Sequence, residues 1–351
     1  MFLDEQASVG IVAEVSNVEA EATYIENYHE AMVAAVAENE YNFNAIMRPV
    51  AVAELAAVKE GKAPRSVWTE GALSSFWEKV KKFFLKVLAK IKGVFASFMS
   101  RIDQHFRSGK SFFDKYKKEL ADKFAKIDKD KVKFMGYEFT AATHTPNSKI
   151  TDGLMKIKFA NLSAAEADAI VADRDKQDEV IEAARGDLIG KGSLTASEFS
   201  KELFEHFRGS DTKEELTNVS FQTVASVLGN DKAKKAIQDS YKGLEKAVNR
   251  FVSDCDRAKN SAINVQVGSE TGDKDEAKSR TAAYPILVSS VKDLLAVAQT
   301  YVGAQMKAVQ DEISQAKAFA GQVLRSAKHE GTSFEEGTVV DGDIFGGVKL
   351  R

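Results

Sequence analysis

The sequence predicts a mainly α-helical protein, an elongated helical bundle with a minor β-hairpin or small sheet near residues 131–160. The chain has 351 residues but only 4 prolines, and because proline interrupts helices, long stretches are free to be helical. Apolar residues recur at helical spacing over several long segments. The 22 phenylalanines, against 2 tryptophans and 8 tyrosines, indicate cores filled by a large side chain that needs no hydrogen-bond partner.

An acidic segment opens the chain. Residues 1–48 carry nine acids and one base, Arg48. Residues 1–64 are rich in Ala and Glu and are predicted to form a helical leader that ends between Gly61 and Pro64. Its helical apolar spacing runs through Tyr24, Tyr28, Met32, Val36 and Phe43.

A basic segment follows over residues 65–130. Residues 65–135 hold eighteen bases and eight acids. The strongest pattern in the sequence predicts an amphipathic helix over residues 73–106, about 50 Å long. Ser108-Gly109 is expected to interrupt it before a second basic helix reaches Ile127. The apolar face of the first helix comprises Phe76, Trp77, Val80, Phe83, Phe84, Val87, Leu88, Ile91, Val94, Phe95, Phe98, Met99 and Ile102.

Residues 131–330 are predicted to form an α-rich body with short strands, with a domain boundary near residue 130. Lys131–Phe134 and Met155–Phe159 alternate between polar and apolar residues, as half-buried strands do. Ile263–Val267 is a further candidate strand.

The helices of this body have recognisable ends. Ser163 with Glu166, and Thr195 with Glu198, match the capping box. Gly229 is the expected end of a helix that begins at Asp211. A further amphipathic helix runs through Ile237, Tyr241, Leu244, Val248 and Phe251.

The C-terminal part combines a loop, a long helix and a tail. Residues 268–280 are expected to form a mobile loop. A helix follows from Pro285 to about His329, and its four-three apolar rhythm is imperfect at Gln305 and Glu312, which favours an antiparallel bundle or a short coiled coil. Residues 331–351 contain five glycines and are expected to form a tail. No repeat of fixed period appears along the chain.

Motifs that carry chemistry are weak. Gly186–Ser193 superficially matches a phosphate-binding loop but has three residues between its glycines and Gly192 after the lysine. Asp173–Glu179 starts like a calcium loop but lacks the turn glycine and the final glutamate. The first segment is therefore expected to be an interhelical loop, and the second a solvated helix face.

Other candidate catalytic and metal-binding residues are scattered. Cys255 is alone, so neither a disulfide nor a thiolate metal site can form within one chain. No pair of histidines has metal-ligand spacing among His29, His105, His144, His206 and His329. The sequence gives no positive support for an enzyme, a cofactor, a metal or a small-molecule substrate.

The basic amphipathic helix is the candidate interaction element. As a membrane span it fails, because six lysines lie between residues 79 and 92 and each would cost about 2.5–3.5 kcal/mol at the bilayer centre. It fits a helix packed against other helices or subunits, a helix on a membrane surface, or a nucleic-acid contact through residues 79–133. The candidate residues are Phe76, Trp77, Lys79, Lys82, Phe83, Phe84, Lys86, Leu88, Lys90 and Phe95.

No signal peptide and no membrane span are expected. The segment Met1–Gln6 carries acids where a signal peptide needs bases. A spanning helix needs about 20 consecutive apolar residues, and no such run occurs.

One tripeptide context recurs in the first 54 residues, at Val12-Ala13-Glu14, Val36-Ala37-Glu38 and Val52-Ala53-Glu54. In this and in its helix-rich, cysteine-poor character, the chain resembles internal head and other virion structural proteins of large tailed phages. Some of those carry an acidic leader that a maturation protease removes, cutting after glutamate in a small-or-aliphatic, any, Glu context. Trp68-Thr69-Glu70 departs from that context at its first position.

The resemblance implies a non-enzymatic structural protein of a large assembly, processed after Glu14, Glu38 or Glu54 and located in the virion or the host cytoplasm. Its partners would be other protein subunits. Two alternatives remain open on the sequence alone: a membrane-surface-active protein and a nucleic-acid-binding protein, each acting through residues 73–106.

Overall fold

The computed structural model describes residues 70–126, 141–157, 162–173, 175–208, 221–229, 231–267 and 274–326. Every regular element within these ranges is helical, so the prediction of a mainly α protein is confirmed. The leader (1–64), the candidate strand Lys131–Phe134 and the tail (331–351) lie outside the described residues.

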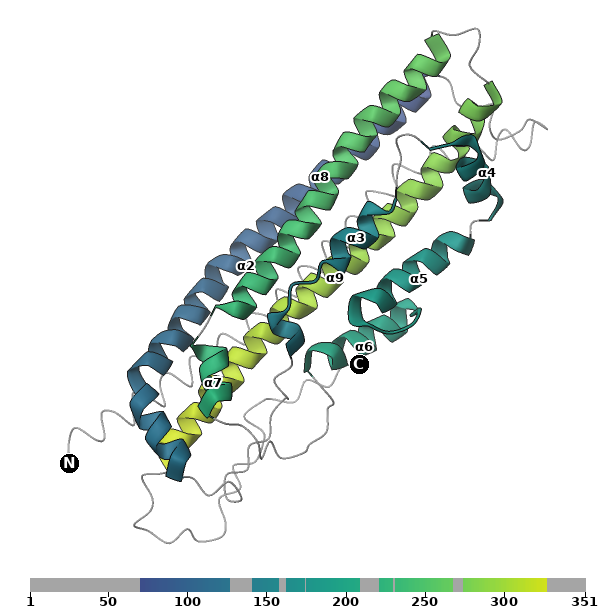
Figure 1. Cartoon of the computed structure of the whole chain (residues 1–351). Helices are drawn as coiled ribbons and strands as arrows, with labels where there is room; N and C mark the ends of the chain where they lie inside the picture. Colours follow the sequence, from purple (N-terminus) through teal and green to yellow (C-terminus); the bar gives the residue numbers. More distant parts are fainter. Residues whose placement is uncertain are drawn as a thin grey trace.

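Three long helices form the body of the molecule (Figure 1). They are α2 (Glu70–Lys126), α8 (Lys232–Val267) and α9 (Lys274–Ser326). Contacts between Trp77 and Tyr284 near one end, and between Phe124 and Phe319 near the other, show that α2 and α9 run parallel. Helix α8 runs antiparallel to both. At 1.5 Å per residue, the 57 residues of α2 make a rod about 85 Å long.

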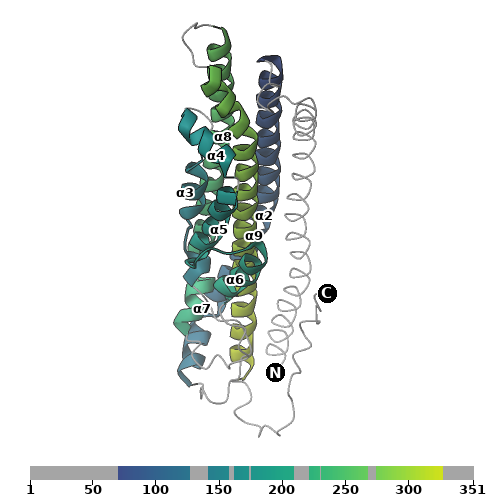
Figure 2. The same ribbon diagram turned by 90° about the vertical axis from the view of Figure 1, so that its right-hand side faces the viewer.

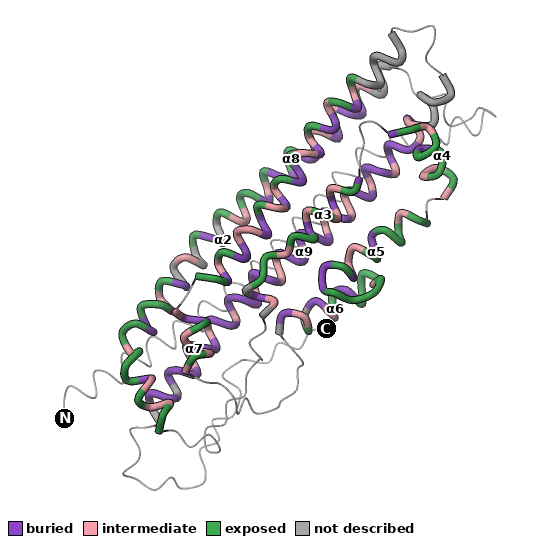
Figure 3. The backbone as a smooth tube through the Cα atoms, viewed as in Figure 1, coloured by how far each residue is buried: buried purple, intermediate pink, exposed green. Residues whose placement is uncertain are grey.

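Helix α9 is the centre of the bundle. All the other described helices pack against it, and no residue between Arg280 and Gly321 is classed as exposed. The tube in Figure 3 shows its burial along most of its length. The same stretch is long and apolar enough to cross a membrane by length and composition, but 67% of it is buried in the fold, as in the core helix of a bundle.

Short helices connect α2 to α8 and cover one side of the bundle (Figure 2). They are η2 (Ala141–His144), α3 (Lys149–Met155), α4 (Ala164–Ala172), α5 (Asp175–Ile189), α6 (Ala196–Arg208) and α7 (Phe221–Leu228). Helix α3 and η2 pack on both α8 and α9, whereas α4, α5 and α6 have α9 as their main long-helix neighbour. The expected hairpin near 131–160 is not present in the described part, because α3 and η2 take its place.

Apolar positions follow an 11-residue period in both α2 and α8, and Ser240 of α8 falls in the same series. An 11-residue period corresponds to 3.67 residues per turn, so the apolar seam drifts little along the helix. This spacing belongs to the apolar positions of two helices and is not a repeat along the chain. In α2 the sets are Phe76, Val87 and Phe98; Trp77, Leu88 and Met99; Val80, Ile91 and Ile102; and Phe84, Phe95 and Phe106. In α8 they are Ala233, Leu244 and Cys255; Ala236, Ala247 and Ala258; Ile237 and Val248; and Ser240 and Phe251.

The expected interruption of α2 at Ser108-Gly109 is wrong. The helix continues through Gly109 to Lys126. Gly109 is buried, and a Cβ placed on it would lie 3.3 Å from side chains of both Ile313 and Leu228. The glycine weakens the helix by roughly 1 kcal/mol relative to alanine, and it allows α2 to approach α7 and α9 closely.

Two other expected boundaries are also wrong. The candidate strand Ile263–Val267 is the last part of α8. Helix α9 begins at Lys274, so Pro285 lies inside the helix, and residues 274–280 belong to it instead of the loop. Proline removes one backbone hydrogen bond, but Ala283 and Tyr284 before it are buried, and Tyr284 contacts Trp77 on α2.

The alternating pattern at Met155–Phe159 does not form a strand within the described residues. Met155 ends α3, and Lys156 forms the turn after it. The Met155 carbonyl accepts a 2.6 Å hydrogen bond from Arg250 on α8. Tertiary contacts therefore decide this segment against its local pattern.

Three predicted helix ends in the body are confirmed, at Ser163, Thr195 and Gly229. The Ser163 hydroxyl accepts from the Glu166 N–H while Glu166 accepts from the Ser163 N–H. Thr195 and Glu198 make the same reciprocal pair. Gly229 follows the last residue of α7 and donates to the carbonyl of Ala225. The expected start of that helix at Asp211 lies outside the described residues.

One hydrophobic core runs from Phe76 to Leu324. The described parts of the basic segment and of the body are therefore packed together, and the expected boundary near residue 130 does not separate two cores.

Candidate interaction surface

The apolar face of α2 is covered within the chain. Phe84 is fully buried, and Phe76, Trp77, Phe83 and Leu88 are also buried, while Phe95 is partly buried. Of the predicted basic residues, Lys79, Lys82 and Lys86 are exposed and Lys90 is intermediate. The structure thus separates the predicted interaction residues into apolar side chains that pack in the core and lysines, three of which lie on the surface.

Aromatic contacts attach this face to the other two long helices. Phe84 stacks on Phe251 of α8 with ring centroids 5.7 Å apart, and Phe95 stacks on Tyr241. Trp77 meets Tyr284 of α9 edge-on at 4.9 Å. Such pairs contribute about 0.5–1.5 kcal/mol beyond the buried area, so of the alternatives left open by the sequence these aromatics take the packing against other helices of the same chain.

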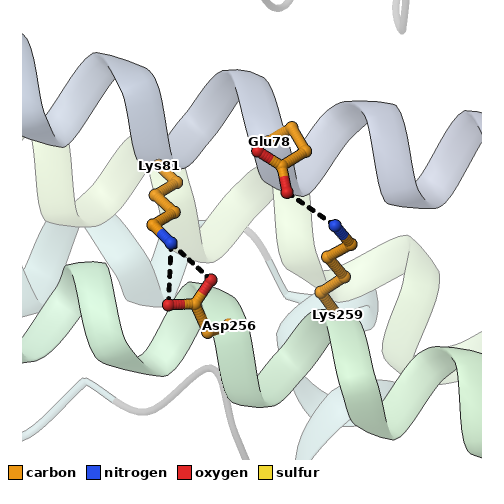
Figure 4. A network of polar contacts seen from close by, with 4 residues as sticks. All are labelled: Glu78, Lys81, Asp256 and Lys259. Atoms are coloured by element: carbon orange, nitrogen blue, oxygen red, sulfur yellow. Dashed lines mark hydrogen bonds and ion pairs between the residues drawn. The ribbon is translucent and has the colours of Figure 1, made fainter.

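A ladder of ion pairs joins the rims of α2 and α8. Lys81, Lys92 and Asp103 lie eleven residues apart on α2, and they pair with Asp256, Glu245 and Lys234, which lie eleven apart on α8. Glu78 adds a rung to Lys259 at 2.5 Å, close to the pair of Lys81 and Asp256 at 2.7 Å (Figure 4). The ladder repeats with the apolar period, because each rim position returns after three turns.

Two of these ion pairs favour the charged form of their α2 member, Glu78 and Lys81. The hydrogen bond from Lys259 lowers the pKa of Glu78, and the hydrogen bond to Asp256 raises the pKa of Lys81. These groups are partly exposed to solvent, so the ladder contributes more to the register between α2 and α8 than to stability.

The exposed lysines form a basic patch near the start of α2. We define the basic patch as Lys79, Lys82, Leu85 and Lys86. None of its three lysines forms an ion pair with a described residue. Leu85, at 44% exposure, is one of two large apolar side chains exposed in the described part of the chain. Further along the same helix, Ala89, Gly93 and Ala96 are exposed and uncharged, so the patch is a local feature.

A polar clamp that sequence reasoning missed holds the segment before α3. The Asn147 N–H donates to Ser240 of α8, and its side-chain amide donates to the Leu188 carbonyl of α5. Gln305, fully buried in α9, donates to the carbonyls of Thr143 and Thr145. The irregular rhythm of α9 at Gln305 was the only signal of this contact in the sequence.

A second clamp holds the end of α3. Arg250 reaches from α8 to the Met155 carbonyl, and its guanidinium also lies 3.3 Å from the buried carboxylate of Asp254. A Cβ on Gly243 would lie 2.4 Å from the Thr151 hydroxyl, so the glycine lets α3 rest directly on α8. Both clamps position covering helices, and neither surrounds a described cavity.

The glycine-rich segment Gly186–Ser193 is a helix end. The N–H of Lys191 donates to the carbonyl of Gly186, and the N–H of Leu194 donates to that of Glu182. The Lys191 side chain pairs with Glu202. Amides that a phosphate loop would aim at its ligand are therefore used by α5 itself.

The remaining candidate groups do not come together in the described part of the chain. Asp173 pairs with Lys176, and Asp175 begins α5, so the calcium-like segment is a helix start. Cys255 is buried, and burial raises the pKa of its thiol, so it is a core residue. No group of three potential metal ligands occurs among the described residues. The side chains of His105 and His144, as well as His29, His329, Glu14, Glu38 and Glu54, lie outside what the structure describes.

No protein-family model, no curated protein and no solved structure matches this chain.

Proposed function

We propose that this chain is a non-enzymatic structural component of a large assembly and works by protein–protein contact. The observation that carries the proposal is the rod formed by α2, α8 and α9. Its ion pairs fix the register between α2 and α8, its other charged side chains lie on the surface, and its buried side chains pack the core. Polar side chains at the core hold covering helices in place, as Gln305 and Arg250 do.

On the basis of the sequence resemblance, we propose that the chain is an internal head protein of a tailed phage. The three candidate cleavage points, Glu14, Glu38 and Glu54, all precede Glu70, where the described fold begins. Cleavage at any of them would remove an acidic leader and leave every described helix intact.

The test is the behaviour of the native protein. Lysate from the native source is separated on a density gradient, and the chain is followed by mass spectrometry. We expect it to sediment with a particle far heavier than 38.4 kDa, and its intact mass to start after one of the three glutamates. Sedimentation as an isolated chain would refute the structural role, and a full-length mass in the particle would refute the processing.

A nucleic-acid-binding role is the second candidate, because Lys79, Lys82 and Lys86 are exposed on successive turns of α2. Three phosphate contacts would give a slope of about −3 in a plot of log affinity against log salt. Affinity for a duplex that is absent or insensitive to salt would exclude this role. The membrane-surface alternative has less support, because α8 and α9 cover the apolar side chains that it would insert.

A further inference from the structure

The two exposed large apolar side chains of the described part have opposite charged surroundings. Leu85 is 44% exposed among the lysines of the basic patch, and Val180 is 42% exposed on α5 next to Asp178 and Glu179. Exposed apolar residues are common singly. Here each one lies beside charged residues of one sign, and the two signs are complementary.

The acidic patch on α5 comprises Asp175, Asp178, Glu179 and Val180. All four residues are exposed. The neighbouring base, Lys176, pairs with Asp173 at 3.0 Å, which leaves the patch acidic. Asp175 and Asp178 also lie in the first turn of α5, where their negative charges interact favourably with the helix dipole. Glu179 lies beyond that turn and next to Val180 in the sequence, so interaction with the helix dipole does not explain why an acid stands at this position.

The two patches have similar dimensions. The basic patch spans residues 79–86, about 10 Å along α2, and the acidic patch spans residues 175–180, about 8 Å along α5. Each presents charges on successive turns with one apolar side chain beside them. Two such helices laid side by side can bring the lysines of one opposite the carboxylates of the other.

The patches cannot meet within one molecule. Helix α5 packs mainly on α9, α6 and α3, whereas α2 packs mainly on α8, α9 and α7. Figures 1 and 2 show α5 and α2 on opposite sides of α9. Complementary surfaces on opposite sides of one subunit are the arrangement that gives head-to-tail association, which extends into a row of copies unless the rotation closes a ring.

We propose that the basic patch on α2 of one copy binds the acidic patch on α5 of a second copy. This inference rests on the proposed structural function and names one of the contacts through which the assembly forms. The contact is small and polar, so it is weak in isolation and weakens as salt screens the charges.

The experiment is sedimentation velocity of the full-length chain over a hundredfold range of concentration at low and high salt. We expect concentration-dependent association at low salt that high salt reverses. Reversal of the basic patch (Lys82→Glu with Lys86→Glu) or of the acidic patch (Asp178→Lys with Glu179→Lys) should each raise the dissociation constant by about tenfold or more. The matched controls Lys246→Glu and Glu205→Lys, at exposed positions on α8 and α6, should leave it unchanged.

Mixing the two reversed variants separates this contact from a general effect of charge. Each variant alone presents two patches of the same sign, whereas an equimolar mixture again presents unlike patches, so association should return in the mixture only. A two-fold symmetric contact through α2 alone would leave the variant with the reversed acidic patch associating as the natural chain does. Circular dichroism melting of each variant checks that the fold is retained.

Three results would overturn the proposal: a monomer at all concentrations, unchanged association in both reversed variants, or failure of the mixture to associate. A monomer that binds a labelled 20-base-pair DNA duplex, and loses that binding in the Lys82→Glu and Lys86→Glu variant, would assign the basic patch to nucleic acid. A monomer that still sediments with a native particle would refute self-association and leave the structural role standing.

Discussion

Gly186 and Gly93 lie in helices, and their surroundings are opposite. A Cβ on Gly186 would lie 1.8 Å from the carbonyl oxygen of Gly192, because the chain after α5 folds back across the helix. A Cβ on Gly93 would have no heavy atom within 4 Å. The first glycine is required by a close backbone approach, and the second one is not.

We therefore expect Gly186→Ala to lower the free energy of unfolding by about 1–3 kcal/mol, because the loop after α5 must move. Gly93→Ala should raise it by up to about 1 kcal/mol, through helix propensity alone. Urea denaturation of both full-length variants measures the difference. Equal effects of the two substitutions would contradict the close approach.

His206 predicts a dependence of stability on pH. Burial lowers the pKa of its half-buried imidazole below the ordinary value of 6.5, and the positive charge of Lys191 lowers it further. The unfolded chain therefore binds a proton at higher pH than the folded chain does. The stability from the neutral imidazole is complete above pH 6.5 and is lost as the pH falls from there toward the lowered value.

The check is a comparison with His206→Phe. The difference in unfolding free energy between the natural protein and the variant should change below pH 6.5, with a slope of at most about 1.4 kcal/mol per pH unit for one proton. Above that pH the difference should be constant. Parallel curves over the whole range would show that the imidazole titrates as it does in the unfolded chain.

For single residues, the sequence predicts a hydrogen bond correctly where its two partners are close together in the chain. The capping boxes at Ser163 and Thr195 join residues three apart, so they were predicted and confirmed. The clamp residues Asn147, Gln305 and Arg250 were missed. Each bonds to residues between 41 and 162 positions away, and local patterns carry no information at that separation.

Among the helices, α2 shows how burial divides one element into core and surface. Phe84 is fully buried against Phe251, and the next residue, Leu85, is 44% exposed. Adjacent residues on a helix point about 100° apart, so neighbours in sequence can differ this much. Substituting each of these two residues therefore tests which face of α2 contributes to the stability of the fold.

We expect Phe84→Ala to lower the free energy of unfolding by about 3–5 kcal/mol, because it removes a buried ring and leaves a cavity. Leu85→Ala should change it by less than about 0.5 kcal/mol, as surface substitutions do. Thermal and urea unfolding of the two variants tests this. Similar losses in both would mean that the outer face of α2 is covered in solution.

The amphipathic character of α2 could be predicted, and its full length could not. The pattern of lysines on one face and phenylalanines on the other is set by residues close together in the sequence, and the described side chains of α2 confirm both faces. The break expected at Gly109 was wrong because the benefit of the glycine depends on Ile313, more than two hundred residues later. The 11-residue period of α2 and α8 was available in the sequence, and it would have indicated that the two helices share one seam and one register.

The whole molecule is long for its mass. A compact globule of 351 residues has a radius of gyration of about 20 Å, whereas a rod about 85 Å long has one of about 25 Å from its length alone. Small-angle X-ray scattering of the full-length chain at high salt should give a radius above about 25 Å. A radius near 20 Å would mean that α2 bends in solution.

The sequence predicted an elongated helical bundle, and it left the neighbours of each helix undetermined. The parallel pairing of α2 with α9 and the antiparallel pairing of α2 with α8 follow from contacts such as Trp77 with Tyr284 and Lys81 with Asp256. Of the candidate site, the lysines Lys79, Lys82 and Lys86 were predicted, and the acidic patch on α5 was not. A complementary pair of surfaces becomes visible only when the sides of the bundle are known.

The central position of α9 has a consequence for synthesis. A ribosome makes this helix after all the other described ones, so α2, α8 and the short helices between them emerge before the surface that all of them share. Trp77 and Tyr284 are separated by more than two hundred residues, and contacts at such separations form slowly. During that interval the phenylalanines of α2 are without their final cover, which makes the nascent chain a substrate for chaperones and sensitive to truncation within its last helix.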